Sequence, residues 1–350
     1  MNSRERVLKT LKGEMPDRVP LFEFIYQQAI YEATINKKPA AYNVLDAIDC
    51  SRVLGVDLVQ GSLGAPEGWT PEFIKDDTYI DEFGTVYQIT DASWPLNAPV
   101  DFPIKDKEDY KKYKWPDPTI KSRTYELIKG LERAKREIAV SGTVYGPFTQ
   151  VWLMMGPEKM LINFYDEPDL MKNLMNDATD YLIEVVKAQD PLGIDVMLVA
   201  EDLGSNSGGF VSNEMFHEFI LPYIERLLKT IKTPIFLHSC GGINEYMEDL
   251  IAAGIDAVHP LQRMAGMDLK TIKEKYGGRV TIVGNVNSSS TLPYGSPEDV
   301  EREVLECLDI GKPGGRYMMS SDHSLHPGIP VENIFKMFET TKKNGRYESL

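Results

Sequence analysis

The chain has 350 residues, 42% of them hydrophobic, which is enough to bury a large core and excludes a small scaffold stapled by disulfides or metals. A net charge of −15 disfavours binding to nucleic acid or to anionic membrane surfaces. The three cysteines are too few for a disulfide framework, and no segment approaches the roughly 20 apolar residues of a membrane span. We therefore expect a cytoplasmic protein without a signal peptide.

Short β-rich runs alternate with helical patterns along the chain. The candidate strands lie at residues 18–24, 55–60, 138–145, 194–200, 233–240, 255–260, 280–285 and 316–321. Several are unbroken apolar runs, such as residues 196–200, which is typical of strands buried on both faces of a parallel sheet. Repeated β-then-α units favour an α/β fold, a (β/α)8 TIM barrel formed by residues 1–350 as one domain. A doubly wound open sheet is the alternative.

Two of the intervening helices carry end signals. Ser212 is a candidate N-cap for a helix whose apolar residues recur at three- and four-residue steps as far as Ile231. The next helical pattern starts at Asn244 and is expected to stop at Gly254, in a left-handed conformation.

Residues 61–136 interrupt the alternation with a stretch rich in Trp, Tyr, Pro and Asp. We interpret this stretch as a long insertion after the second strand. Long loops at the carboxyl rim of a barrel commonly cover the active site, so we expect the insertion to cover the barrel mouth. Surface decoration is the alternative.

Reactive residues of such barrels gather at the carboxyl ends of the strands. In this chain those ends offer Glu23, Gln60, Tyr145, Glu201, Asp202, His238, Cys240, His259, Gln262, Asn285, Asp322 and His323. Only two places hold good ligands for a transition metal. The first is the pair His238 and Cys240, whose spacing of two on a strand puts an imidazole and a thiol on one face, as Zn²⁺ accepts in open catalytic sites.

The second place is His323, after the last candidate strand. Because a barrel brings its strand ends around one mouth, His323 could complete a set with His238 and Cys240 and leave a fourth position open. The alternative is a buried cysteine beside a hydrogen-bonded histidine, with His323 capping loop backbone. His259 is interpreted as a packing residue.

Glu201 and Asp202 form a carboxylate pair at the end of the fourth candidate strand. The pair could supply a fourth metal ligand, a general acid or a hydrogen-bond partner for a histidine, or it could be ordinary carboxylates approaching a helix. Motifs of other chemistries are missing from the sequence: no G-x-S-x-G, no P-loop and no G-x-G-x-x-G after a strand occurs.

At these residues the chain resembles the uroporphyrinogen decarboxylase superfamily, and within it the zinc methyltransferases that exchange methyl groups with corrinoid proteins. The resemblance is carried by residues 4–8, 13–20, 201–204, 238–241, 284–286 and 315–330. It implies a (β/α)8 barrel, in agreement with the strand count.

Two departures narrow what the resemblance implies. True decarboxylases carry an arginine-rich segment after the opening motif, whereas residues 21–28 contain no arginine. An acidic protein without that segment is poorly suited to a substrate with many carboxylates. In the coenzyme M methyltransferases, a His-x-Cys motif is followed far downstream by a second cysteine. In this chain the position that matches this second cysteine is His323. Zn²⁺ held by His238, Cys240 and His323 remains implied, but a thiol acceptor does not.

The leading hypothesis is therefore a zinc-dependent methyltransferase that moves a methyl group between a corrinoid protein and a small methylated compound or thiol. A methoxy aromatic is one candidate substrate, with Tyr145, Phe148 and Asn285 as binding residues and Glu201 or Asp202 as the catalytic carboxylate. Because the chain lacks an Asp-x-His-x-x-Gly signature, the corrinoid (methylcobalamin) is expected on a separate partner protein.

Other functions stay open at this point. The first alternative is a cofactor-free decarboxylase of the uroporphyrinogen decarboxylase type, acting on an unknown carboxylate substrate. The second is a non-catalytic binding protein. The sequence also leaves open a homodimer.

Overall fold

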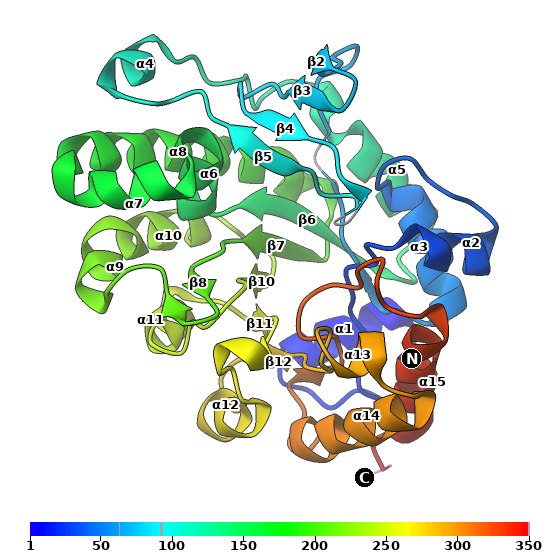
Figure 1. The fold of residues 1–350 in the computed structure, drawn as a ribbon. Helices are drawn as coiled ribbons and strands as arrows, with labels where there is room; N and C mark the ends of the chain where they lie inside the picture. The colour runs from blue at the N-terminus through cyan, green and yellow to red at the C-terminus, as the bar shows by residue number, and fades with distance from the viewer. Residues whose placement is uncertain (63, 92–93, 349–350) are drawn as a thin grey trace.

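A ring of parallel strands forms the centre of the molecule (Figure 1). The computed structural model describes residues 1–62, 64–91 and 94–348, so residues 63, 92 and 93 of the predicted insertion and residues 349 and 350 lie outside the described part. Seven strands pair in parallel in the order β1 (Leu58–Val59), β6 (Ala139–Tyr145), β7 (Val196–Ala200), β10 (Ile235–His238), β11 (Ala257–His259), β12 (Thr281–Val283) and β13 (Tyr317–Met318). Each strand falls within one of the predicted runs.

The first predicted strand, residues 18–24, closes the ring. Leu21 forms a parallel bridge with Met319 after β13, and Phe22 forms another with Leu58 of β1. The bridges do not extend into a longer ladder, and Pro20 supplies one reason, because proline has no N–H and can only accept the hydrogen bond from the Met319 N–H. The predicted (β/α)8 barrel is thus confirmed, and the open-sheet alternative is not.

Helices surround the ring (Figure 1). They are α2 (Gln28–Ile35), α3 (Val44–Leu54), α5 (Tyr125–Ala134), α6 (Pro147–Met155), α7 (Pro157–Asp166), α8 (Pro168–Gln189), α9 (Asn213–Phe219), α10 (Leu221–Leu228), α11 (Met247–Ala253), α12 (Leu269–Tyr276), α13 (Thr291–Tyr294), α14 (Pro297–Gly311) and α15 (Val331–Asn344), with short 3-10 turns at η3 (Asp190–Leu192) and η4 (Arg263–Ala265). Among the described residues, no helix has the length and apolar character needed to cross a bilayer.

The predicted helix ends agree with the structure at Ser212 and Gly254 but not at Ile231. Ser212 caps α9 as predicted, because its side chain accepts a hydrogen bond from the Met215 N–H. The prediction of one helix reaching Ile231 was wrong, because the helix is interrupted at Ile220. A second helix, α10, begins at Leu221 with Pro222 in its first turn, where the missing N–H of proline is tolerated. Gly254 ends α11 in the left-handed conformation as expected, with φ of 108°.

The stretch after β1 holds a second, antiparallel sheet. It consists of β2 (Glu72–Lys75), β3 (Thr78–Ile80), β4 (Val86–Gln88) and β5 (Ala98–Asp101), followed by α4 (Lys107–Lys112) and η2 (Lys121–Thr124). The helix α5, which ends the predicted insertion, packs on α3 and β6 and takes its place in the outer helical layer. Tyr79 and Tyr87 of the antiparallel sheet approach Tyr145 at the carboxyl end of β6, which supports the proposal that the insertion covers part of the mouth.

The amino end of the barrel is closed by α1 (Ser3–Leu11). Val7 and Leu11 of this helix join the apolar cluster formed by inward side chains of the strands. Beside them the fully buried Asp57 accepts hydrogen bonds from Arg6 Nη1 at 2.6 Å, from Arg18 Nη1 at 2.8 Å and from the Leu21 N–H at 2.8 Å. One carboxylate therefore ties α1 to the first strand and to β1, at the end of the barrel opposite the site described next.

Candidate metal centre

The carboxyl ends of β10 and β13 bring three predicted residues together. His238 ends β10, Cys240 follows two residues later, and His323 lies in the loop after β13. The sulfur of Cys240 is 3.3 Å from His238 Nε2 and 3.3 Å from His323 Nε2. The alternation of side chains along an extended segment places the first two on one face, and closure of the barrel brings the third to them.

Asp202 joins the same cluster from the loop after β7. Its Oδ1 accepts a hydrogen bond from the Cys240 N–H at 2.9 Å and lies 3.8 Å from His238 Nε2. Ligand atoms of Asp202, His238 and Cys240 all lie within 4.8 Å of one another. The sulfur of Cys240 is thus shared by two sets of donors, one completed by His323 and one by Asp202.

Burial sets the protonation of this cluster. It lowers the pKa of His238 to about 4 and also lowers the pKa of His323, so both imidazoles are neutral at pH 7 and have lone pairs to offer. Burial and the nearby Asp202 carboxylate raise the pKa of the Cys240 thiol well above its usual value. Without a cation the thiol stays protonated, whereas a bound divalent cation would favour the thiolate.

The donor set fits zinc. Zn–S bonds of about 2.3 Å and Zn–N bonds of about 2.0 Å at a tetrahedral angle separate sulfur and nitrogen by roughly 3.5 Å. The two measured separations between sulfur and imidazole nitrogen are 3.3 Å. Two neutral imidazoles, a thiol and a carboxylate are also the ligand types that zinc prefers among biological donors.

Glycines hold the loop that carries Cys240. Gly241 has φ of 80°, and a Cβ there would lie 2.2 Å from the Gly204 carbonyl carbon, in the hairpin of β8 (Gly204–Ser205) and β9 (Gly208–Gly209). Only glycine combines that conformation with so close an approach of two backbones. Gln262 accepts the Gly241 N–H at 2.8 Å and fixes the loop from the other side. The position of the sulfur is therefore set by backbone packing.

Glu201 faces away from the cluster, toward the start of α6. Its carboxylate is fully buried and accepts hydrogen bonds from the N–H groups of Phe148 and Thr149, at 2.9 Å and 2.8 Å. Burial raises the pKa of Glu201 to about 7, although the two N–H groups and the helix terminus favour its charged form. The structure therefore separates the roles of the two adjacent carboxylates, with Asp202 at the cluster and Glu201 at the helix.

This raised pKa leads to a prediction about stability and pH. A carboxyl whose folded-state pKa exceeds its unfolded value of 4.5 stabilises the fold at low pH, and that contribution is lost as pH rises toward about 7. Glu201→Gln mimics the protonated acid at every pH. We therefore expect its free energy of unfolding, relative to that of the wild type, to be about 2 to 3 kcal/mol higher at pH 8 than at pH 5, at about 1.4 kcal/mol per pKa unit. Urea unfolding at both pH values measures this difference, and a pH-independent difference would contradict it.

The three predicted substrate-binding residues lie in different environments. Tyr145, at the end of β6, is 44% exposed, and its hydroxyl lies near enough to the Asp202 carboxylate for their charges to interact. Phe148 is fully buried and stacks on Phe210 in the apolar core. The amide group of Asn285 donates to the Leu261 carbonyl at 3.0 Å and is likewise buried. Of the three, Tyr145 is the one whose side chain is exposed beside the cluster.

Sequence reasoning missed the contribution of His259. Its Nδ1 lies 2.9 Å from Nδ1 of His238, and its ring is fully buried. A signal for this contact did exist: both histidines end neighbouring parallel strands, and the register pairs them directly. His259 therefore packs against aromatic rings of the core and also contacts His238.

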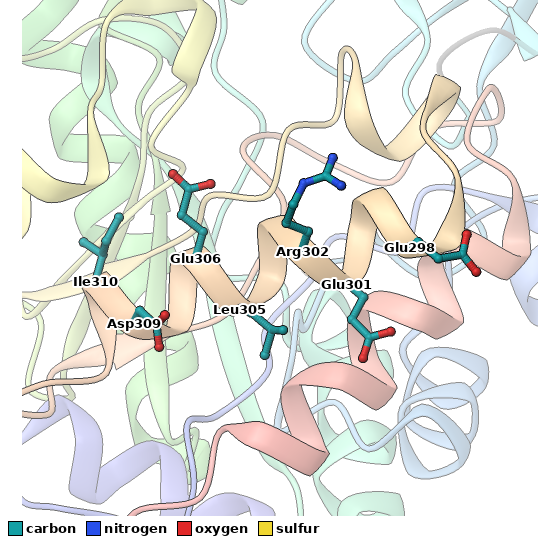
Figure 2. A pocket seen from close by; sticks show the side chains of 7 residues that line it. All are labelled: Glu298, Glu301, Arg302, Leu305, Glu306, Asp309 and Ile310. Carbon is teal, nitrogen blue, oxygen red and sulfur yellow. The ribbon is translucent and has the colours of Figure 1, made fainter.

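A depression on the outer surface follows α14, away from these residues (Figure 2). Its lining residues all come from this one helix, and they are Glu298, Glu301, Arg302, Leu305, Glu306, Asp309 and Ile310. Their side chains point to different sides of the helix and do not converge on a centre (Figure 2). The chemistry-bearing residues thus gather at the barrel mouth.

Together, a closed parallel barrel and a cluster of imidazole, thiol and carboxylate at its mouth define a barrel protein with a candidate catalytic metal centre. The sequence profile of the uroporphyrinogen decarboxylase (URO-D) family matches residues 83–344. The chain belongs to this family.

Individual relatives come from both the decarboxylases and the methyltransferases. The uroporphyrinogen decarboxylase of Alkalilimnicola ehrlichii is 25% identical over 265 residues, covering 70% of this chain and 69% of the relative. The methylated-thiol–coenzyme M methyltransferase of Methanosarcina mazei is 25% identical over 225 residues, covering 63% and 59%. Other decarboxylases match over a shorter part of the chain. The match to that of Xanthomonas oryzae pv. oryzae covers 51% of the length of each protein, at 29% identity.

A solved structure confirms the fold over the whole barrel. The structure of a methyltransferase from Methanosarcina mazei superposes with a TM-score of 0.77 and covers 98% of this chain and 99% of its own, at 18% identity. A B12-independent methionine synthase from Shewanella superposes less well, with a TM-score of 0.53 at 13% identity. At such identities the superpositions establish the architecture.

Proposed function

We propose that this protein is a zinc-dependent methyltransferase that moves a methyl group between a corrinoid carried by a partner protein and a small methylated compound or thiol. The observation that carries the proposal is the position of the Cys240 sulfur, 3.3 Å from both His238 Nε2 and His323 Nε2. The similarity to a methylated-thiol–coenzyme M methyltransferase supports it.

His238, Cys240 and His323 would hold the zinc ion, with Asp202 beside them. Bound there, zinc would supply Lewis-acid chemistry for a thiolate or for the oxygen or sulfur from which a methyl group departs. Asp202 Oδ1 accepts the hydrogen bond of the Cys240 N–H and so orients the segment that carries the sulfur, and the carboxylate could also orient a substrate. Glu201 has a supporting role, since it holds the start of α6 against the Asp202 loop.

Two tyrosines, Tyr26 and Tyr145, lie beside the proposed reaction centre. Tyr26 donates a hydrogen bond to Gln60 Oε1 at 2.9 Å, and its ring lies near Cys240 and Tyr145. With Tyr79 and Tyr87 from the antiparallel sheet, these rings offer aromatic faces and hydroxyl groups to a small substrate. This composition suits a methoxy aromatic compound. The corrinoid partner would approach over the same mouth.

Decarboxylation is the second candidate, and the similarity to curated decarboxylases favours it. The segment after the opening motif argues against the porphyrin substrate. Residues 21–28 contain no arginine, and their one carboxylate side chain, Glu23, is buried. A polyanion would find no cationic side chain in this segment.

Two measurements on the purified protein test the proposal. Elemental analysis is expected to find one zinc per chain after metal-free buffers have removed loosely bound ions. Cobalamin absorbance would then follow methyl transfer to cob(I)alamin from a methoxy aromatic, or from methylcobalamin to a thiol. Wild-type protein without stoichiometric zinc, or carbon dioxide release without methyl transfer, would overturn the proposal in favour of the decarboxylase.

A further inference from the structure

A continuous line of buried polar side chains runs from His238 into the barrel interior. His238 Nδ1 is 2.9 Å from His259 Nδ1, and His259 Nε2 is 3.2 Å from Ser320 Oγ. Ser320 Oγ is in turn 3.4 Å from Glu23 Oε2. His259 and Ser320 are fully buried and Glu23 is 4% exposed. Four parts of the barrel, β10, β11, the segment after β13 and the first predicted strand, thus contribute one residue each to a hydrogen-bonded line that starts at the candidate metal centre.

The hydrogens along this chain are determined by the metal-facing end. The contact between two Nδ1 atoms needs one hydrogen, carried by one ring or the other. When Nε2 of His238 offers its lone pair to a cation, the hydrogen of that ring sits on Nδ1 and is donated to His259. His259 then carries its own hydrogen on Nε2 and donates it to Ser320, whose hydroxyl donates onward to Glu23. In this inward arrangement each hydrogen bond of the line is donated away from the metal centre, toward Glu23.

Without a cation, hydrogen bonds donated in the opposite direction, toward the metal centre, fit the same distances. His259 can donate from Nδ1 to His238, His238 can direct its Nε2–H at the Cys240 sulfur, and Ser320 can donate to His259. The chain therefore has two arrangements, and only the inward one exposes a lone pair at the metal centre. Whatever stabilises the inward arrangement prepares His238 for metal binding.

Glu23 is the group that favours the inward arrangement. Among the ion pairs of the described residues none involves Glu23, and its carboxylate accepts only from neutral groups: the N–H groups of Phe24 and Ser321 and the hydroxyls of Ser320 and Ser321. In its ionised form Glu23 can only accept, so it orients the Ser320 hydroxyl toward itself and leaves the serine lone pair for His259. Burial raises the pKa of Glu23 to about 8, so this preference is strongest above that pH.

We propose that His259, Ser320 and Glu23 are positioning residues that hold the ring of His238 with its Nε2 lone pair toward Cys240 and Asp202. This inference rests on the proposed function and extends it, because it assigns a metal-directed task to residues that are not themselves proposed ligands. A ligating histidine that donates its other ring N–H is a general feature of metal sites, and loss of such a partner weakens metal affinity by about 10- to 100-fold.

Two adjacent serines provide a matched test. Ser320 and Ser321 are both fully buried, and both hydroxyls contact Glu23, but of the two only Ser320 touches His259. We expect Ser320→Ala to raise the zinc dissociation constant by about 10- to 100-fold in competition with a chromogenic chelator. Ser321→Ala is expected to stay close to the wild type.

A second measurement does not depend on any variant. The chain contains five histidines, so the ring nitrogens of 15N-histidine-labelled protein can be resolved by NMR. In zinc-loaded wild type we expect the hydrogen of His238 on Nδ1 and that of His259 on Nε2.

The outcomes separate this inference from the proposed function. Wild type that binds no zinc overturns both. Wild type that binds zinc, together with equal effects of Ser320→Ala and Ser321→Ala or a hydrogen on Nδ1 of His259, overturns the positioning role alone. Should Ser320→Ala fail to fold, the NMR result decides.

Discussion

Replacing Cys240 by alanine is expected to remove zinc and methyl transfer together. The sulfur is the donor shared by both ligand sets, so its loss leaves two imidazoles and a carboxylate without a common centre. We expect less than stoichiometric zinc by elemental analysis and a rate of methyl transfer lower by roughly a thousandfold. That factor corresponds to about 4 kcal/mol of transition-state stabilisation.

Cys50→Ala provides the control, because Cys50 is likewise a free cysteine, buried away from the cluster. It lies on α3 in the outer layer, where Thr34 Oγ1 contacts its sulfur at 3.2 Å. This variant should keep its zinc and its rate. Full activity in Cys240→Ala, or an equal loss in both variants, would contradict the assignment of Cys240 as a zinc ligand. A His238→Ala, Cys240→Ala double variant should be no less impaired than the single one.

The second large effect is expected at the opposite end of the barrel. Asp57→Ala would leave Arg6 and Arg18 without the buried carboxylate that both contact, and would free the Leu21 N–H. Removing one partner of a buried ion pair typically costs about 3 to 5 kcal/mol. We expect the free energy of unfolding to fall by that amount, measured by urea unfolding followed by far-UV circular dichroism.

Asp49→Ala is the control for this prediction. Asp49 pairs with Arg133 Nη2 at 2.7 Å, but this pair lies at the surface, with Asp49 23% and Arg133 51% exposed. Surface ion pairs contribute about 0 to 1 kcal/mol. If the two variants lost similar stability, the closing role of Asp57 would be wrong.

The strands illustrate what local sequence can predict. Unbroken apolar runs such as residues 196–200 identified some of the strands buried on both faces, and seven of the eight candidate strands pair in the barrel as named strands. The antiparallel sheet was not foreseen: β2 reads Glu-Phe-Ile-Lys, which shows no alternation of apolar and polar residues, and all four residues are exposed. The break at Ile220 was missed as well, because the apolar spacing continues across two helices and hides the end of the first.

Some features of the candidate site also follow from local sequence, whereas others depend on tertiary packing. That His238 and Cys240 share a face follows from the two-residue period of an extended chain, which is a local property and readable from sequence. Whether Phe148 or Asn285 faces a cavity or the core depends on how the loops around them pack, and the structure buries both. The carboxylates Glu201 and Asp202 are adjacent in sequence, yet packing directs one to α6 and the other to Cys240.

The sequence by itself determined the barrel, its strand runs and the pairing of one imidazole with one thiol, because period and composition act over a few residues. Tertiary structure alone decided that Asp202 joins the cluster, that His259 contacts His238 and that Glu23 ends a polar chain behind them. These contacts join residues on different strands, and their distances follow from strand register and barrel closure, which no short stretch of sequence encodes.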